Sequence, residues 1–113
     1  MAYDETLSQR MRDALAGMQG VSEKKMMGGL CFMLNGNMIG GADRTKDGVG
    51  RFMFRVGKDN AAAADALPKG EVMEMGGRTM SGLYFVDADD CDDALMQSWL
   101  SLALSFVTTL PPK

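Results

Sequence analysis

The dipeptide Asn35-Gly36 constrains the fold more than any other feature of the chain, because it separates two short apolar runs, residues 30–34 and 38–39. Both central residues of a type I′ turn need a positive φ, and Asn followed by Gly meets that need with little strain. The first run is apolar at every position, so a strand formed there has two apolar faces. We therefore predict a β-hairpin whose first strand is central in its sheet or covered on both sides.

Further strands are indicated by short apolar runs bounded by glycine or charged residues: 37–41, which completes the hairpin, 51–56, 71–75 and 83–86. In the segment 51–56, Phe52, Phe54 and Val56 alternate with other residues, so these three are predicted to face the core. The polar residues 21–25 are predicted to form a connector rather than a strand. Residues 42–50 are predicted to form a long polar loop.

Helices are predicted at residues 3–16, 58–67 and 92–108. In the first segment Leu7, Met11 and Leu15 recur at helical spacing, and either Asp4 or Thr6 can cap its start. The last segment has a wide apolar surface, which predicts a helix lying flat on a sheet. Its main stripe contains five residues: Leu95, Trp99, Leu102, Phe106 and Leu110. Four more widen this surface: Leu100, Ala103, Leu104 and Val107.

The predicted element order is α-β-β-β-α-β-β-α. Helices that cover one face of an antiparallel sheet make a two-layer α+β domain. We therefore expect one domain over residues 1–113, with a five-stranded antiparallel sheet. The second apolar face of residues 30–34 then needs either partial cover within the chain or a partner chain.

Composition excludes several classes of function. The 113 residues contain no histidine, which removes Ser-His and Cys-His catalysis and His-based metal sites. The net charge is −3, whereas a domain that binds nucleic acid by itself usually has a basic excess. No apolar run approaches the roughly 20 residues that a membrane-spanning helix needs. We expect a cytoplasmic protein with no membrane partner.

Sulfur chemistry is limited to Cys31, Cys91 and an unusually large number of methionines, 12 in all. A disulfide would need an oxidising compartment, so we expect two free thiols. Without a histidine partner, Cys31 is interpreted as a small apolar filler rather than a nucleophile. The methionines fit either a Met-rich core or an adaptable exposed surface.

Two other motifs resemble ligand sites without matching them. The aspartates between Asp87 and Asp93 have Asp92 where a calcium loop needs glycine and Ser98 where it needs glutamate. They are interpreted as the start of a helix, where carboxylates cap and complement the dipole. The glycines at 76–82 precede a strand and lack the spacing of a phosphate-binding loop. We expect no cofactor and no metal.

The polar residues most suggestive of function are five cations from the predicted strands and their turns: Lys24, Lys25, Arg51, Arg55 and Arg78. If the sheet brings them together, they form a basic patch suited to an acidic partner or a phosphate backbone. The alternative is scattered solvated charges, or local ion pairs with Glu23, Glu71 and Glu74.

The sequence resembles the N-terminal domain of TfoX/Sxy-like proteins over about 105 residues. The resemblance is carried by Lys24-Lys25-Met26, Gly28-Gly29-Leu30 and the segments 34–38, 54–57, 77–82 and 110–112. The residues of these motifs interpreted as structural are Met26, Gly28, Gly29, Asn35, Gly36, Gly77 and Gly82, together with Trp99. The resemblance implies the same order of helices and strands. The best-known members regulate natural competence as transcription coactivators, which implies a protein partner in the transcription machinery.

These observations favour a non-enzymatic regulatory domain that binds a protein through a sheet edge or an exposed strand face. A homodimer would cover the second apolar face of residues 30–34. One alternative is a nucleic-acid-binding accessory protein that uses the basic patch. Another is a small-molecule binder or enzyme, although the sequence contains no evident acid–base or nucleophile–base pair.

Overall fold

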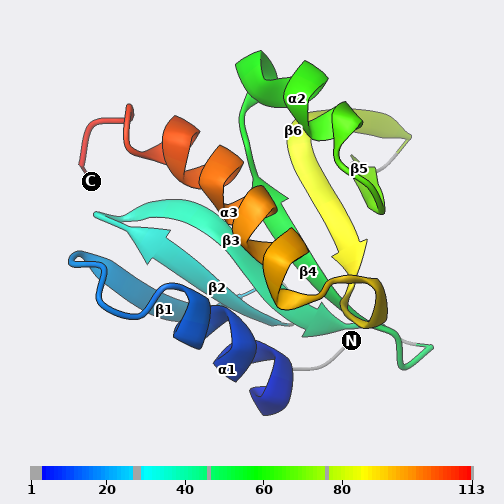
Figure 1. Cartoon of the computed structure of the whole chain (residues 1–113), viewed down its shortest axis with the longest axis horizontal. Coiled ribbons are helices and arrows are strands. Elements are labelled where there is room, and N and C mark those ends of the chain that lie inside the picture. The colour runs from blue at the N-terminus through cyan, green and yellow to red at the C-terminus, as the bar shows by residue number, and fades with distance from the viewer. Residues whose placement is uncertain (1–3, 27–28, 46, 76, 113) are drawn as a thin grey trace.

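The computed structural model describes residues 4–26, 29–45, 47–75 and 77–112 (Figure 1). Its elements in chain order are α1 (Glu5–Ala14), β1 (Val21–Met26), β2 (Gly29–Leu34), β3 (Asn37–Arg44), β4 (Gly50–Arg55), η1 (Lys58–Asn60), α2 (Ala61–Ala66), β5 (Gly70–Met75), β6 (Arg78–Asp87), η2 (Ala88–Asp90) and α3 (Asp93–Val107). The predicted helix at 58–67 is therefore a 3₁₀ turn followed by a short α-helix.

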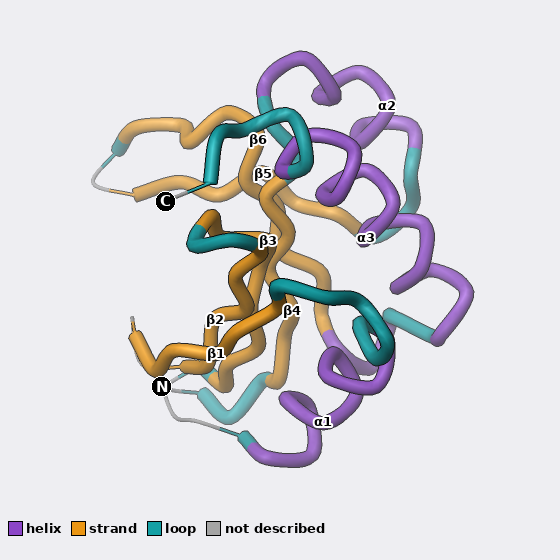
Figure 2. Tube along the Cα trace, turned by 90° about the vertical axis from the view of Figure 1, so that its left-hand side faces the viewer, coloured by secondary structure: helices purple, strands orange, loops and turns teal. Residues whose placement is uncertain are grey.

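The described strands form one antiparallel sheet in the order β1-β2-β3-β4-β6-β5. Helices α1 and α3 pack on β3 and β4, and α2 packs on α3. Figure 2 shows all three helices on the same side of the sheet. The predicted two-layer α+β fold is confirmed, but the prediction of five strands was wrong, because the described sheet has six.

The sixth strand is β1, where the sequence predicted a connector. It pairs with β2 along its whole length, from Val21 opposite Leu34 to Met26 opposite Gly29. β1 lies at the edge of the sheet, so its side chains are mostly exposed and show no apolar alternation. Main-chain pairing with the hairpin strand therefore forms this element, and side-chain patterning could not reveal it.

The predicted turn at Asn35-Gly36 is confirmed, because both residues have a positive φ, 52° and 86°. Gly29, which the sequence marked as structural, lies close to the neighbouring backbone, because an added Cβ would lie 2.5 Å from the carbonyl oxygen of Ala42. Gly28 lies outside the described residues. The predicted loop at 42–50 is shorter than expected, because β3 continues to Arg44 and β4 begins at Gly50.

The last strand is also longer than predicted, since β6 begins at Arg78 rather than at residue 83. Its Gly82 has a φ of 88°, and an added Cβ there would lie 2.8 Å from the main chain of Gly57. On the neighbouring strand β5, the pairing register shifts between Val72 and Met73, opposite this part of β6. In Figure 2 the end of β5 and the start of β6 extend away from the helix layer.

The core between sheet and helices is centred on Trp99, whose side chain is fully buried. Its ring stacks on Phe54 at 5.7 Å between centroids and lies 5.3 Å from the ring of Tyr84. The predicted core residues of the first helix and of β4 are buried: Leu7, Met11, Leu15, Phe52, Phe54 and Val56.

The main stripe predicted on the last helix was only partly correct, because four of its five residues are half-buried: Leu95, Leu102, Phe106 and Leu110. The buried residues of α3 are Met96, Trp99, Leu100, Ala103 and Val107, and three of these are among the positions predicted to widen the stripe. The helix is apolar on more than one face, so periodicity left its rotation on the sheet undetermined.

Aspartates cap two of the helices. Asp4 accepts a hydrogen bond from the Leu7 backbone N–H, and Asp92 accepts one from that of Leu95. The bond from Leu7, with the neighbouring Arg44 guanidinium, lowers the pKa of the Asp4 carboxyl. Arg44 also joins α1 to β3 through its 2.6 Å ion pair with Asp4. The aspartate run before α3 thus provides a helix cap, as predicted.

Replacing Trp99 tests the role of this ring. The Trp99→Ala variant should lose about 3–5 kcal/mol of unfolding free energy, as expected for a large buried aromatic residue. The Trp99 Nε1 group is buried without a hydrogen-bond partner among the described residues. Trp99→Phe keeps an aromatic ring and removes this unsatisfied donor, so it should lose less than half as much. Urea unfolding measures both, and equal losses would contradict this view of the core.

Candidate functional site

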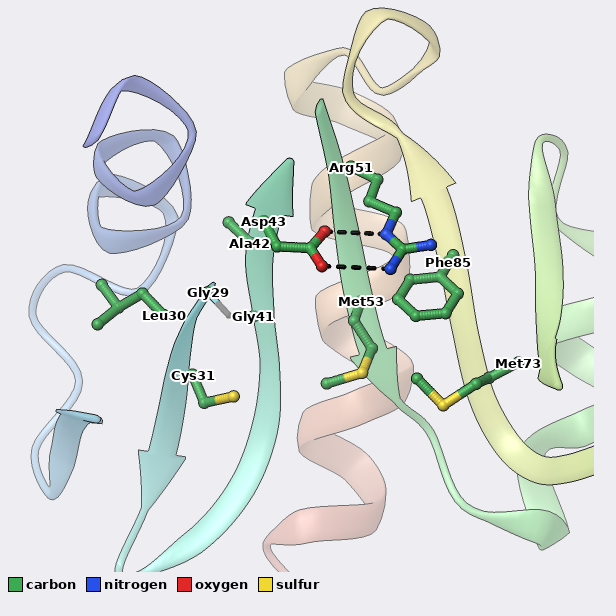
Figure 3. Close-up of a pocket in the computed structure, with 10 residues that line it drawn as sticks. All are labelled: Gly29, Leu30, Cys31, Gly41, Ala42, Asp43, Arg51, Met53, Met73 and Phe85. Carbon is green, nitrogen blue, oxygen red and sulfur yellow. Dashed lines mark hydrogen bonds and ion pairs between the residues drawn. The ribbon is translucent and has the colours of Figure 1, made fainter. Parts of the chain in front are cut away.

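The face of the sheet opposite the helices contains a hollow of about 310 Å³ (Figure 3). Strand register places Cys31, Gly41, Met53 and Phe85 side by side on this face, one each from β2, β3, β4 and β6. Met73 of β5 lines the same space. We call it the apolar hollow, defined by these five residues and the pair Asp43 and Arg51.

The apolar hollow accounts for the second apolar face of the first hairpin strand. Cys31, Met53 and Met73 are each less than 8% exposed, although the helices cover only the other side of the sheet. Gly41 helps to keep the space open, because an added Cβ there would lie 3.5 Å from the Cys31 sulfur. Alternate side chains of β2 therefore face the core and this hollow, and both sets are apolar.

A paired charge lies at one end of the apolar hollow. Arg51 donates two hydrogen bonds to the Asp43 carboxylate, from Nε at 2.9 Å and from Nη2 at 3.2 Å. The guanidinium also lies over the Phe85 ring, 3.8 Å from its centroid. Figure 3 shows this three-residue arrangement above the two methionines. The pair is locally neutral, and its bidentate geometry fixes the orientation of Arg51 beside Phe85.

The chemistry available in the apolar hollow is limited. Burial raises the pKa of the Cys31 thiol, and the nearby Asp43 carboxylate raises it further. Both changes favour the protonated thiol, which is a poor nucleophile. Cys91 is also a buried free thiol, and burial is the main cause that raises its pKa to about 11. Within the described residues, no group of three His, Cys, Asp or Glu side chains could hold a metal ion.

A second, wider hollow of about 610 Å³ adjoins the first and shares Arg51 and Phe85 with it. We call it the acidic hollow. Its walls include Thr45, Asp47 and Val49, which lie between β3 and β4, and the start of β5. It contains five exposed carboxylates, those of Asp47, Glu71, Glu74, Asp87 and Asp90, against two cations, Arg51 and Lys69. Val49 and Val72, which are 43% and 39% exposed, also line it.

The structure does not bring the five predicted cations together. Lys24 pairs with Cys31 and Lys25 with Leu30, so these neighbours lie on opposite faces of β1. Arg78 begins β6 beside β5, at the opposite edge of the sheet from β1.

The remaining two cations of that set already have partners. Arg51 forms an ion pair with Asp43, and the Arg55 guanidinium lies 5.2 Å from the centroid of the Phe106 ring on α3. The described positions thus give several separate charges rather than one basic patch.

Sequence reasoning did not group the residues of either hollow into one site. Met53 was only one of the residues that alternate with the predicted core positions of 51–56, and Asp43, Met73 and Phe85 were not singled out. The two-faced apolarity of residues 30–34 was the one available signal. Locating the hollow also requires the strand order, which places β2, β3, β4 and β6 side by side.

Comparison with protein-family models gives a match to the TfoX N-terminal domain over residues 13–107. The chain belongs to this family. Comparisons with curated proteins and with solved structures gave no significant match. Among the described residues of this TfoX N-terminal domain, no helix has both the length and the apolar character needed to cross a membrane.

Thiol reactivity tests the environment of Cys31. In a Cys91→Ser variant, Ellman's reagent should modify the native protein at pH 8 at least about tenfold more slowly than the urea-unfolded chain, whose thiol pKa is near 8.5. The raised pKa and the burial of Cys31 both slow this reaction. Rapid modification of the native protein at pH 7 would instead indicate an accessible thiolate.

Proposed function

We propose that this TfoX N-terminal domain is a non-enzymatic regulatory module of the cytoplasm that binds a protein partner through the helix-free face of its sheet. The observation that carries the proposal is the apolar hollow on that face. An apolar recess with a few oriented polar groups is typical of a recognition site. The family resemblance favours a partner in the transcription machinery.

The choice of a binding role over catalysis rests on the groups that line the hollow. Cys31 is biased towards its protonated form, and Asp43 is occupied by Arg51. A catalytic nucleophile needs a base within hydrogen-bond reach or a lowered pKa, and the lining provides neither arrangement for Cys31. Both thiols are free in the described structure, in keeping with a reducing compartment.

Two other modes of binding that the sequence suggested have less support. Nucleic-acid binding needs a contiguous basic surface, whereas Lys24 and Arg78 lie near opposite edges of the sheet. A homodimer was expected in order to cover the second apolar face of residues 30–34. Cys31 on that face is already 96% buried within one chain, so its burial does not require a second copy.

An affinity pull-down from the native host tests the proposal. The wild-type domain should retain a partner that a Phe85→Ala variant loses, because Phe85 joins the two hollows. Phe106→Ala is a matched control. It removes another half-buried aromatic ring that lies beside an arginine, but on the helix layer.

Circular dichroism should first establish that both variants are folded. Capture of the same partner by the wild-type and Phe106→Ala proteins, with loss only in Phe85→Ala, is the expected result. Equal capture by all three proteins, or no specific capture by the wild type, would contradict the proposed binding face.

A further inference from the structure

The two hollows differ sharply in chemistry but lie next to each other. They share Arg51 and Phe85, so a bound segment could not occupy their junction without touching both residues. Sulfur and aromatic side chains dominate one side of this junction, and carboxylates dominate the other. We call the two hollows together the trough.

The carboxylates of the acidic hollow have no ion-pair partner among the described residues. Within the described residues, none of the five forms an ion pair, whereas the Arg44–Asp4 and Arg51–Asp43 pairs elsewhere are closely formed. Of the two cations in this hollow, Arg51 is already paired with Asp43. The wall therefore has an excess of negative charge, which would attract cations and repel a phosphate backbone.

The same wall exposes an apolar side chain. Val49 is one of four large apolar side chains that are exposed among the described residues, and it lines the acidic hollow. Its exposure is independent of the charge and favours a partner that buries apolar area. Exposed apolar side chains next to a recess mark interaction surfaces more often than isolated ones do.

We propose that the occupant of the trough is a partner segment with an apolar or aromatic anchor flanked by lysine or arginine. The anchor fills the apolar hollow against Met53, Met73 and Phe85, where the paired charge of Arg51 and Asp43 adds no net charge. The flanking cations face the carboxylates of the acidic hollow. This inference rests on the proposed function, and it specifies the chemistry of the partner.

The cationic flank supplies selectivity and the anchor supplies most of the burial. Exposed ion pairs are individually weak and are screened by salt, so the charge term should be largest at low ionic strength. An anchor in a desolvated pocket usually dominates binding free energy. A segment that has only one of the two features should therefore bind poorly.

Three fluorescent peptides test this division by anisotropy. The first has Leu-Phe flanked on each side by two lysines, the second has glutamates in place of the lysines, and the third has Gly-Ser in place of Leu-Phe. At low salt the first should bind at least about tenfold more tightly than either of the others. Its advantage over the glutamate peptide should fall in about 0.5 M salt.

Charge reversal on the protein provides the complementary test. Glu71→Lys combined with Asp87→Lys should remove the preference for the lysine peptide, because both exposed side chains belong to the acidic hollow. The control is Asp13→Lys combined with Asp59→Lys, which makes the same change in net charge at exposed positions of α1 and η1. The control should keep the wild-type preference.

Several results would overturn the inference. These are equal affinity for the lysine and glutamate peptides, equal loss in both charge-reversed proteins, or tighter binding of a labelled single-stranded DNA in the trough. Dimerisation that is detected by light scattering and weakened by Phe85→Ala would instead assign the trough to a second copy.

If no peptide binds while Phe85→Ala still loses a captured partner, only this inference fails. If no partner is captured at all, the proposed function fails.

Discussion

The whole structure depends on one-sided packing of the helices around Trp99. The indole ring lies between α3 and the sheet, stacked on Phe54 and beside Tyr84, and α1 and α3 both pack on the same two strands. Burial of this aromatic cluster fixes the helix layer on one face. The opposite face must then accommodate its own apolar side chains without a helix. It does so as a recess, and that recess is the feature to which we assign function.

The recess follows from a few local choices of residue. Gly41 leaves space between Cys31 and Met53, which strand register would otherwise fill with a side chain. The pairing of Arg51 with Asp43 places a charge beside Phe85 at little electrostatic cost, because the pair is bidentate and partly solvated. The domain therefore combines a rigid apolar recess with an acidic wall, although its sheet is built from ordinary antiparallel pairs.

Much of this fold could be predicted from local signals. Asn35-Gly36 fixed the hairpin because its turn needs two positive φ angles, and the alternation of Phe52 and Phe54 fixed the face of β4. Strand β1 could not be predicted, because its polar edge sequence shows no apolar alternation; main-chain pairing with β2 and the ion pair of Glu23 with Arg12 hold it in place. The rotation of α3 was only partly predicted, since a helix that is apolar on more than one face has no unique stripe.

The site was less predictable than the fold because it is assembled from distant parts of the chain. Lys24 and Lys25 attracted attention as adjacent charges, but strand alternation sends them to opposite faces. Conversely, Asp43 and Phe85 are 42 residues apart in the sequence. Both contact Arg51, because β4 lies between β3 and β6 in the sheet. Local patterns identify such residues as strand positions, and their shared recess appears only when the order of strands is known.

The most direct measurement is amide chemical-shift mapping of the nitrogen-labelled domain during titration with the Leu-Phe peptide flanked by lysines. We expect the largest changes at Cys31, Met53, Glu71 and Phe85, with little change along α1 and the exposed side of α3. Changes concentrated on the helix layer or on the outer edge of β1 would contradict the assignment of function to the helix-free face.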